Sequence, residues 1–437
     1  MELPTIAAFL AIATIIFIGF FGNLFFSRFK IPDILFLIAL GMILGPDILG
    51  TYLGVMSVTT LDLLNQFSDV FLSAALVIIL FDGGLGLSLR AVTASMRLST
   101  IMSVSAFLLS MFSVGLILNL IMNVDFMVAL CLGAIVGGTS SAIVIPIVAK
   151  MTIEPKTKAM LCMESVITDV FVVVGALAIL SIISIGQIDA VLILKDLASK
   201  FVLGGLVGFV AGIAWLFVLR GLQNQPFSYM ITVAALFAVS AFVELPPVSS
   251  SGAVAALAFG LSIGNKEIIS KRLKLKMTYQ SDIQIQQFQS EITFFVRSFF
   301  FVYLGMLFRF GTFTEIHLFA GLLIISVIVL ARWIVALMMH KLGALKFSDS
   351  MTIFAMMPRG LAAAVLATVP AVVLAGSSFW NESLTTLFLN TTLLVILGTT
   401  ILTTIFAFAT ERNARRQKAR KRLDEIVKIA HPCDQDI

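Results

Sequence analysis

The chain has 437 residues, of which 59% are hydrophobic and only 12% are charged, with a net charge of +5 and a mean hydropathy of +1.08. A soluble domain carries about 25% charged residues, so this composition excludes an ordinary soluble protein. Apolar runs near the roughly 20 residues that cross about 30 Å of hydrocarbon continue to about residue 410. Lipid offers backbone groups no other partner, so these runs must be helical, and the chain is predicted to be an all-α polytopic membrane protein.

The apolar runs predict about thirteen membrane spans. They cover residues 4–26, 31–49, 68–89, 98–121, 126–149, 158–185, 197–219, 228–243, 248–264, 289–309, 314–339, 350–375 and 384–410. Pro246 and Pro247 divide the eighth and ninth, which could instead form one re-entrant segment. No basic stretch precedes the first span and no small-residue cleavage pattern follows it, so we expect a span there rather than a signal peptide.

The basic residues predict the orientation of the spans, because Lys and Arg collect in cytoplasmic loops. With the N-terminus outside, most of the 29 basic residues fall in inside loops or in the tail. We therefore expect a plasma-membrane protein whose N-terminus is outside and whose C-terminus is cytoplasmic. Residues 411–437 form a short basic tail directly after the last span, a position that favours contact with anionic lipid headgroups over nucleic acid.

Two predicted spans carry helix-breaking residues at corresponding places. The fifth contains Gly137-Gly138 and the twelfth contains Pro358-Arg359-Gly360. The two spans stand seven apart, so they cross the membrane in opposite directions. This predicts two inverted-topology repeats with crossed discontinuous helices, at about residues 4–185 and 228–410, joined by a linker helix at about 197–219. Matched breaks of this kind indicate the binding site of a secondary transporter.

The sixth span contains two carboxylates, Glu164 and Asp169, although a charge at the bilayer centre costs roughly 2.5–3.5 kcal/mol. Five helical positions separate them by about 140° around the axis, so we expect different roles. Asp169 shares a face with Ser165, and Thr139 and Ser140 at the fifth-span break add further oxygen ligands, a set suited to a small monovalent cation. A buried acid can also hold a proton, so one carboxylate is sufficient for exchange of a cation for H+.

The other intramembrane charges are expected to form structural pairs. Glu164 needs a cationic partner because an unpaired buried anion is costly, and Arg359 at the twelfth-span break is the predicted one. Arg297 and Arg332 are further buried charges for which ion pairing is expected. Asp82 in Phe81-Asp82-Gly83-Gly84 has two equal interpretations, an interfacial helix end or a functional residue. No Cys-x-x-Cys motif or His cluster indicates a metal centre, and no cofactor is expected.

These motifs together resemble the monovalent cation/proton antiporters, in particular the NhaP-like branch with thirteen spans. The features that carry the resemblance are the Thr139 break, the run from Glu164-Ser165 to Asp169, the Pro-Arg-Gly break and the stretch after Arg297. The resemblance covers about residues 1–410. It implies a homodimer in which spans four to six and eleven to thirteen move, in an elevator-like motion, against a dimerisation domain.

The resemblance also implies roles for single residues. Asp169 matches the essential carboxylate that binds cation or proton, and Ser165 and Thr139 match ligands of the ion. Glu164 with Arg359 matches a pair that ties the crossing helices together. Thr168 stands where the branch usually has Asn, and it is included with Ser140 among the ion-binding candidates.

The sequence departs from the branch in span five, and this departure leaves the identity of the transported ion undecided. The branch usually has Asp-Pro after Thr139, whereas Ser140-Ser141 is similar to the glutathione-gated potassium efflux relatives. Without that acid a claim for tight sodium binding is weaker, so Na+ is expected first and K+ remains an alternative. With Thr168 in place of an acid, one carboxylate titrates on the transport face, and we predict electroneutral one-for-one exchange.

These patterns do not exclude other classes of function. A cation channel or uniporter would need repeated filter elements around an axis, and the sequence shows two inverted halves instead. An anion or organic-acid carrier is the closest transporter alternative because several arginines are buried. We do not expect an enzyme, since no His or Lys is predicted near Ser140 or Ser141 to activate a nucleophile.

Overall fold

The structure is a computed structural model, and only part of it is described. The described residues are 13–22, 33–45, 58–86, 89–185, 190–222, 227–246, 250–273, 281–306, 313–343, 345–374 and 380–430, with a few single residues between them. Most of the basic inside loop at residues 272–280 and the end of the tail after residue 430 therefore lie outside it.

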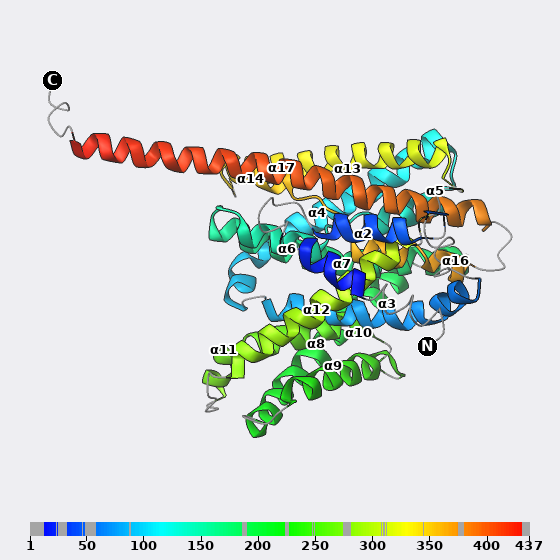
Figure 1. The fold of residues 1–437 in the computed structure, drawn as a ribbon, viewed down its shortest axis with the longest axis horizontal. Helices are drawn as coiled ribbons and strands as arrows, with labels where there is room; N and C mark the ends of the chain where they lie inside the picture. Colours follow the sequence, from blue (N-terminus) through cyan, green and yellow to red (C-terminus); the bar gives the residue numbers. More distant parts are fainter. Residues whose placement is uncertain are drawn as a thin grey trace.

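The regular secondary structure of the described residues is helical (Figure 1). After a helix at Ala13–Gly22 come α2 (Asp33–Leu44), α3 (Val58–Gly86), α4 (Leu89–Met122), α5 (Phe126–Ile135), α6 (Ser141–Lys150), α7 (Pro155–Ile185), α8 (Ala190–Gly221), α9 (Ser228–Glu244), α10 (Gly252–Gly264), α11 (Lys266–Arg272), α12 (Ser281–Met306), α13 (Glu315–Lys341), α14 (Phe347–Ala355), α15 (Leu361–Leu366), α16 (Val369–Val373) and α17 (Glu382–Ala430). Each predicted span coincides with one helix or with a broken set of helices.

Five described helices are long and apolar enough to cross a membrane alone. They lie in α4, α7, α8, α13 and α17, and α10 with α11 would add a sixth despite a 69° bend between them. The remaining predicted spans correspond to shorter apolar helices, to helices interrupted by a break or, at residues 289–309, to the long but less apolar α12. The count of thirteen therefore stays a prediction, while the order of apolar helices along the chain agrees with it.

Both predicted breaks are present. In the fifth span α5 ends at Ile135 and α6 begins at Ser141. In the twelfth, α14 ends at Ala355 and α15 begins at Leu361. Glycine and proline in these segments disfavour a continuous helix, and the short halves leave free backbone groups at membrane depth, where other protein groups must bond them.

The helices pack as two groups whose backbones approach each other at few places, while buried side chains of α2, α3 and α12 share one apolar cluster with the second group. The first group contains α2, α3, α8, α9, α10 and α12, and the second contains α4 to α7, α13 to α15 and α17. Figure 1 shows α13 and α17 side by side along one edge, away from α8, α9 and α12. The groups touch where α3 meets α6 and α15, where α7 meets α8, and where α2 meets α17. Both broken spans belong to the second group.

Polar contacts tie the second group together where α6 passes into α7. Glu411 on α17 accepts hydrogen bonds from Thr152 N at 2.7 Å and Thr152 Oγ1 at 3.0 Å. Lys346 Nζ, just before α14, lies 2.6 Å from Glu154 Oε1. The hydrogen bond and charge of Lys346 hold the pKa of the exposed Glu154 carboxyl below its usual value. These contacts put the α6–α7 connection, the α13–α14 connection and α17 residue 411 on one side of the molecule.

Candidate functional site

The two breaks cross each other. Ser140 N, at the end of the first break, donates to Pro358 O in the second break at 2.8 Å. The approach leaves room only for glycine at position 360, because a Cβ there would lie 2.3 Å from Ser140 Oγ. Two segments more than 200 residues apart in the chain therefore meet backbone to backbone inside the second group of helices.

Side-chain hydroxyls from neighbouring helices bond the free backbone groups at the crossing. Thr399 Oγ1 on α17 accepts from Arg359 N at 3.0 Å, and Thr403 Oγ1 accepts from Met357 N at 3.3 Å. Thr168 Oγ1 on α7 accepts from Thr139 N at 3.1 Å. These bonds replace the partners that a continuous helix would provide, so the breaks are stable without water at these atoms.

Gly138 lets the first break approach α7, and its replacement should destabilise the protein. A Cβ at this position would lie 2.5 Å from Val172 Cγ2 and 2.8 Å from the Thr168 carbonyl oxygen. We expect Gly138→Ala to cost about 1–3 kcal/mol, the usual range for overpacking. Thermal unfolding in a fixed detergent measures this, with Gly221→Ala as the control because a Cβ there has no neighbour within 4 Å. Equal melting temperatures for both variants would contradict the close approach.

Asp169 on α7 faces the first turn of α6. Its Oδ2 accepts from Ser141 N at 3.1 Å and from Ser141 Oγ at 2.5 Å. The N-terminal end of α6 therefore points at the carboxylate, and the helix dipole favours a negative charge there. Asp169 is partly exposed, whereas Glu164 is only 1% exposed. Of the two carboxylates, Asp169 belongs to the more exposed residue.

Glu164 forms an ion pair with Arg332 rather than with the predicted Arg359. Arg332 Nη2 lies 2.7 Å from Glu164 Oε2, and Nη1 contacts Oε1. Arg332 Nε also donates to the Ile353 carbonyl at 2.8 Å, near the C-terminal end of α14. One arginine on α13 thus links α7 to the second broken span. Its positive charge lies near the C-terminal end of α14, where the dipole of that helix favours a cation. The expected Glu164–Arg359 pair is wrong because α13, which carries Arg332, presents its own cation to Glu164.

Arg359 is nevertheless part of the same charged cluster. Its side chain is 2% exposed, and its charged neighbours are Arg332 and Glu164. Its Nε has no hydrogen-bond partner within the described part of the chain. The charged cluster around Glu164 thus holds one carboxylate and two guanidinium groups.

Three of the hydroxyls predicted as ion ligands, those of Thr139, Ser165 and Thr168, make hydrogen bonds to groups other than Asp169. Thr139 Oγ1 and Thr168 Oγ1 share a hydrogen bond of 3.1 Å, and Ser165 Oγ donates to the Cys162 carbonyl at 2.9 Å. Ser140 contacts the second break through its backbone N–H. The residue that contacts Asp169 is Ser141, which the sequence reasoning did not include among the ligands. Its position as the first residue of α6, where backbone N–H groups are free, was the signal that could have identified it.

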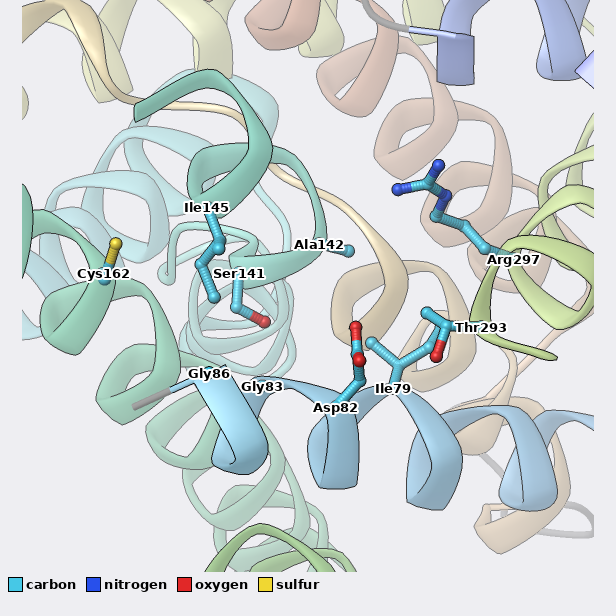
Figure 2. A pocket seen from close by; sticks show the side chains of 10 residues that line it. All are labelled: Ile79, Asp82, Gly83, Gly86, Ser141, Ala142, Ile145, Cys162, Thr293 and Arg297. Carbon is cyan, nitrogen blue, oxygen red and sulfur yellow. The ribbon is translucent and has the colours of Figure 1, made fainter. Parts of the chain in front are cut away.

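A cavity of about 100 Å³ reaches Ser141 from the first group of helices (Figure 2). Figure 2 shows Asp82 rising from α3 and Arg297 reaching in from α12, while Ser141 and Ile145 of α6 form the facing wall. Water needs roughly 10–15 Å³ of such space, so the cavity has room for several waters or a hydrated cation. Asp82 and Arg297, predicted as buried, are both partly exposed here, whereas Arg332 is 3% exposed.

The comparison with family descriptions covers nearly the whole chain. Residues 12–410 match the family described as sodium/hydrogen exchanger, transmembrane. The chain belongs to this family. As a family member it is a multi-pass membrane transporter protein, in agreement with the apolar helices described above.

Individual relatives of this exchanger family member are distant in sequence. The probable Na(+)/H(+) antiporter 2 of Methanocaldococcus jannaschii is 24% identical over 372 residues, which cover 81% of this chain and 84% of the relative. The K(+)/H(+) antiporter NhaP of Alkalimonas amylolytica is 25% identical over 263 residues, which cover 59% of this chain and 44% of that protein. The chain therefore spans less than half the length of this K(+)/H(+) antiporter.

A solved structure shares the fold of the exchanger family member. The sodium proton antiporter MjNhaP1 from M. jannaschii at pH 8 superimposes with a TM-score of 0.75 and 19% identity, covering 93% of this chain and 98% of that chain. This match shows that the all-helical membrane architecture is the same. The predicted resemblance to the antiporters is thereby confirmed at the level of family and fold.

Proposed function

We propose that the protein is a secondary antiporter that exchanges a monovalent cation, Na+ or K+, for H+ at Asp169. The observation that carries the proposal is the single partly exposed carboxylate beside the crossing of two broken spans, bonded by Ser141 at the start of α6. A carboxylate can be neutralised by one proton or coordinate one cation, so the two ions compete. Family membership and the printed names of the relatives support the same activity.

The charges at the site support one-for-one exchange without net current. With Asp169 ionised, its charge and that of Glu164 balance those of Arg332 and Arg359. Binding of one H+, or of one Na+ or K+, gives these four side chains together a net charge of +1. The two loaded forms therefore carry the same charge across the membrane. In vesicles a cation gradient should therefore move protons without a change of membrane potential. A potential generated by exchange would contradict this stoichiometry.

The packing of the helices supports alternating access by an elevator-like motion. The second group contains both broken spans, and its helices pack more closely with one another than with the first group, as expected for a part that moves as one body. In this proposal the first group forms the stationary domain of a homodimer in the plasma membrane, with the N-terminus outside and the C-terminus cytoplasmic. The described cavity then lies on the cytoplasmic side, because the basic inside loops adjoin the nearby ends of α3, α7 and α12.

The experiment that tests the function is cation-dependent proton movement in vesicles containing the purified protein. Na+, K+ and Li+ are added in turn, and the interior pH is followed. We expect at least Na+ or K+ to dissipate an acid interior. Cation flux that continues without proton movement would indicate a uniporter or channel, and a response to anions alone would indicate an anion carrier. Either result contradicts the proposal.

Ser141 should determine how strongly the site holds a cation. Hydrogen bonds to charged groups contribute about 1.5–3 kcal/mol, so Ser141→Ala should change the apparent cation affinity by roughly tenfold or more. The matched control is Ser165→Ala, because Ser165 Oγ bonds the Cys162 carbonyl in this structure rather than Asp169. The apparent KM for the cation is measured for both variants. A large change of KM in Ser165→Ala with none in Ser141→Ala would instead support Ser165 as the ion ligand, as expected from the sequence.

A further inference from the structure

The first residue of α4 is hydrogen-bonded to the other group of helices. Leu89 N donates to Asn265 Oδ1 at 2.7 Å, although the two residues stand 176 positions apart in the chain. α4 packs with α5, α7 and α13 in the second group, whereas Asn265 directly follows α10, which belongs to the first. This hydrogen bond therefore joins the two groups.

Asn265 is placed to hold the start of a helix. The residue is only 6% exposed, and its Nδ2 donates to the Leu261 carbonyl at 2.8 Å, which fixes the amide against the end of α10. The first N–H groups of a helix have no acceptor within that helix, and Asn265 provides one for Leu89. The side chain thus links the end of α10 to the beginning of α4.

The Leu89 side chain adds an apolar contact at the same place. It packs against a buried cluster that includes Phe81 of α3, Phe259 and Ile263 of α10 and Ile269 of α11. These helices belong to the first group or continue from it. The start of α4 therefore lies on the first group through both its backbone and its side chain, while the main part of the helix packs with the second group.

The end of α3 is held firmly on α10. A Cβ at Gly264 would lie 2.3 Å from the Leu85 carbonyl oxygen, and a Cβ at Gly84 would lie 2.2 Å from the Leu257 carbonyl oxygen. Backbones that approach this closely leave little freedom to slide. α4 begins shortly after α3 ends, so a movement of the second group relative to the first has to be taken up close to Leu89.

The hydrogen bond lies at the same end of α3 as the cavity beside Ser141, because Gly86, the last residue of α3, lines that cavity. On the basis of the proposed antiport function, we propose that Asn265 is a positioning residue that holds the start of α4 on the first group while the cavity is open, and releases it when the second group moves. The bond stabilises one of the two conformations and so sets the balance between them. Asn265 does not contact the transported ion in this proposal.

The test measures the apparent cation KM separately on the two membrane faces, in sealed vesicles of each orientation. In alternating access each conformation binds ions from one face, so the ratio of the two KM values follows the equilibrium between the conformations. The cavity face is identified in a Cys433→Ser background by a membrane-impermeant thiol reagent, because Cys162 lines the cavity and Cys131 is only 1% exposed. The rate of this modification also reports the cavity-open population without any ion transport.

The variants remove either side of the hydrogen bond. Asn265→Ala removes the acceptor, and Leu89→Pro removes the donor, since proline has no N–H and is accepted at the first position of a helix. Asn265→Asp is the conservative variant because it keeps an oxygen acceptor. The matched control is Ser262→Ala, since Ser262 is also buried on α10 but its Oγ donates to the Phe209 carbonyl of α8 at 2.9 Å, within the first group.

We expect Asn265→Ala to raise the KM on the cavity face relative to the opposite face by roughly twofold to tenfold, the range for one lost hydrogen bond, and to slow the modification of Cys162. Leu89→Pro should change both quantities in the same direction. The double variant should shift the ratio by less than the two single shifts combined, because both act on one bond. Asn265→Asp and Ser262→Ala should leave the ratio unchanged.

Three results would overturn the role of Asn265: an unchanged KM ratio in Asn265→Ala, the same shift in Asn265→Asp, or an equal shift in Ser262→Ala. If Asn265→Ala does not fold, the direction of the change in Leu89→Pro decides. Absence of exchange in the wild type would instead overturn the antiport function. Because modification of Cys162 needs no transport, equal modification rates in all variants would count against Asn265 alone.

Discussion

Asp169→Asn should reduce cation-driven proton movement to that of protein-free vesicles. The amide has nearly the same shape as the acid, but it can neither release a proton nor supply a negative charge to a cation. Asn can still accept the hydrogen bonds that Ser141 donates, so the variant should fold. The measurement is the cation-dependent change of interior pH, supported by cation-triggered proton release from the purified protein in detergent.

The control for this prediction is Asp125→Asn. Asp125 makes the same kind of contact at the start of α5, where its carboxylate accepts from Met127 N at 2.9 Å and from Val128 N at 3.2 Å. Asn caps helices about as well as Asp, so this variant should keep both fold and exchange. Exchange that survives in Asp169→Asn would refute Asp169 as the shared site for cation and proton.

The second large effect is expected on stability, when one partner of the Glu164–Arg332 pair is removed. Both side chains are buried, at 1% and 3% exposed, and they form two parallel contacts. Glu164→Gln leaves the guanidinium of Arg332 without its counter-charge, and such losses cost about 3–5 kcal/mol. Arg332→Gln should be similarly damaging, and it also removes the bond to the Ile353 carbonyl. Unfolding of the purified variants in one detergent measures the loss.

Two comparisons make this stability prediction specific. The double variant Glu164→Gln with Arg332→Gln should be more stable than the sum of the single losses predicts, because neither buried charge is then unpaired. Glu154→Gln breaks an ion pair with Lys346 that is exposed to solvent, and it should have a much smaller effect. A strong loss in Arg359→Gln with none in Arg332→Gln would favour the pairing expected from the sequence.

The sequence was sufficient to predict the architecture because the bilayer restricts it. Apolar runs of a fixed length must be helices, and Gly137-Gly138 and Pro358-Arg359-Gly360 disfavour the continuation of one. Both breaks are present where these residues stand. The spacing of Glu164 and Asp169 predicted that they face different surroundings. In the structure Glu164 is buried in an ion pair and Asp169 is partly exposed.

The partners of these carboxylates could not be predicted from local spacing. Arg332 and Arg359 both lie in apolar spans, and which one meets Glu164 depends on how α13 and α14 rotate and pack against α7. The choice among Thr139, Ser140, Ser141 and Ser165 likewise depends on the path of the backbone through the break, which puts Ser141 at a helix start facing Asp169. The cavity with Asp82 and Arg297 forms only where α3, α6 and α12 come together.

The sequence by itself determined that the chain is an all-helical membrane protein with two interrupted spans and an acid suited to ion exchange. Those properties follow from composition and from helix geometry, which act within one segment. Only the tertiary structure decided that Arg332 neutralises Glu164, that Ser141 contacts Asp169, and that Asp82 and Ser141 line one cavity. Contacts between distant helices depend on their relative rotation and separation, and no pattern within a single span encodes either.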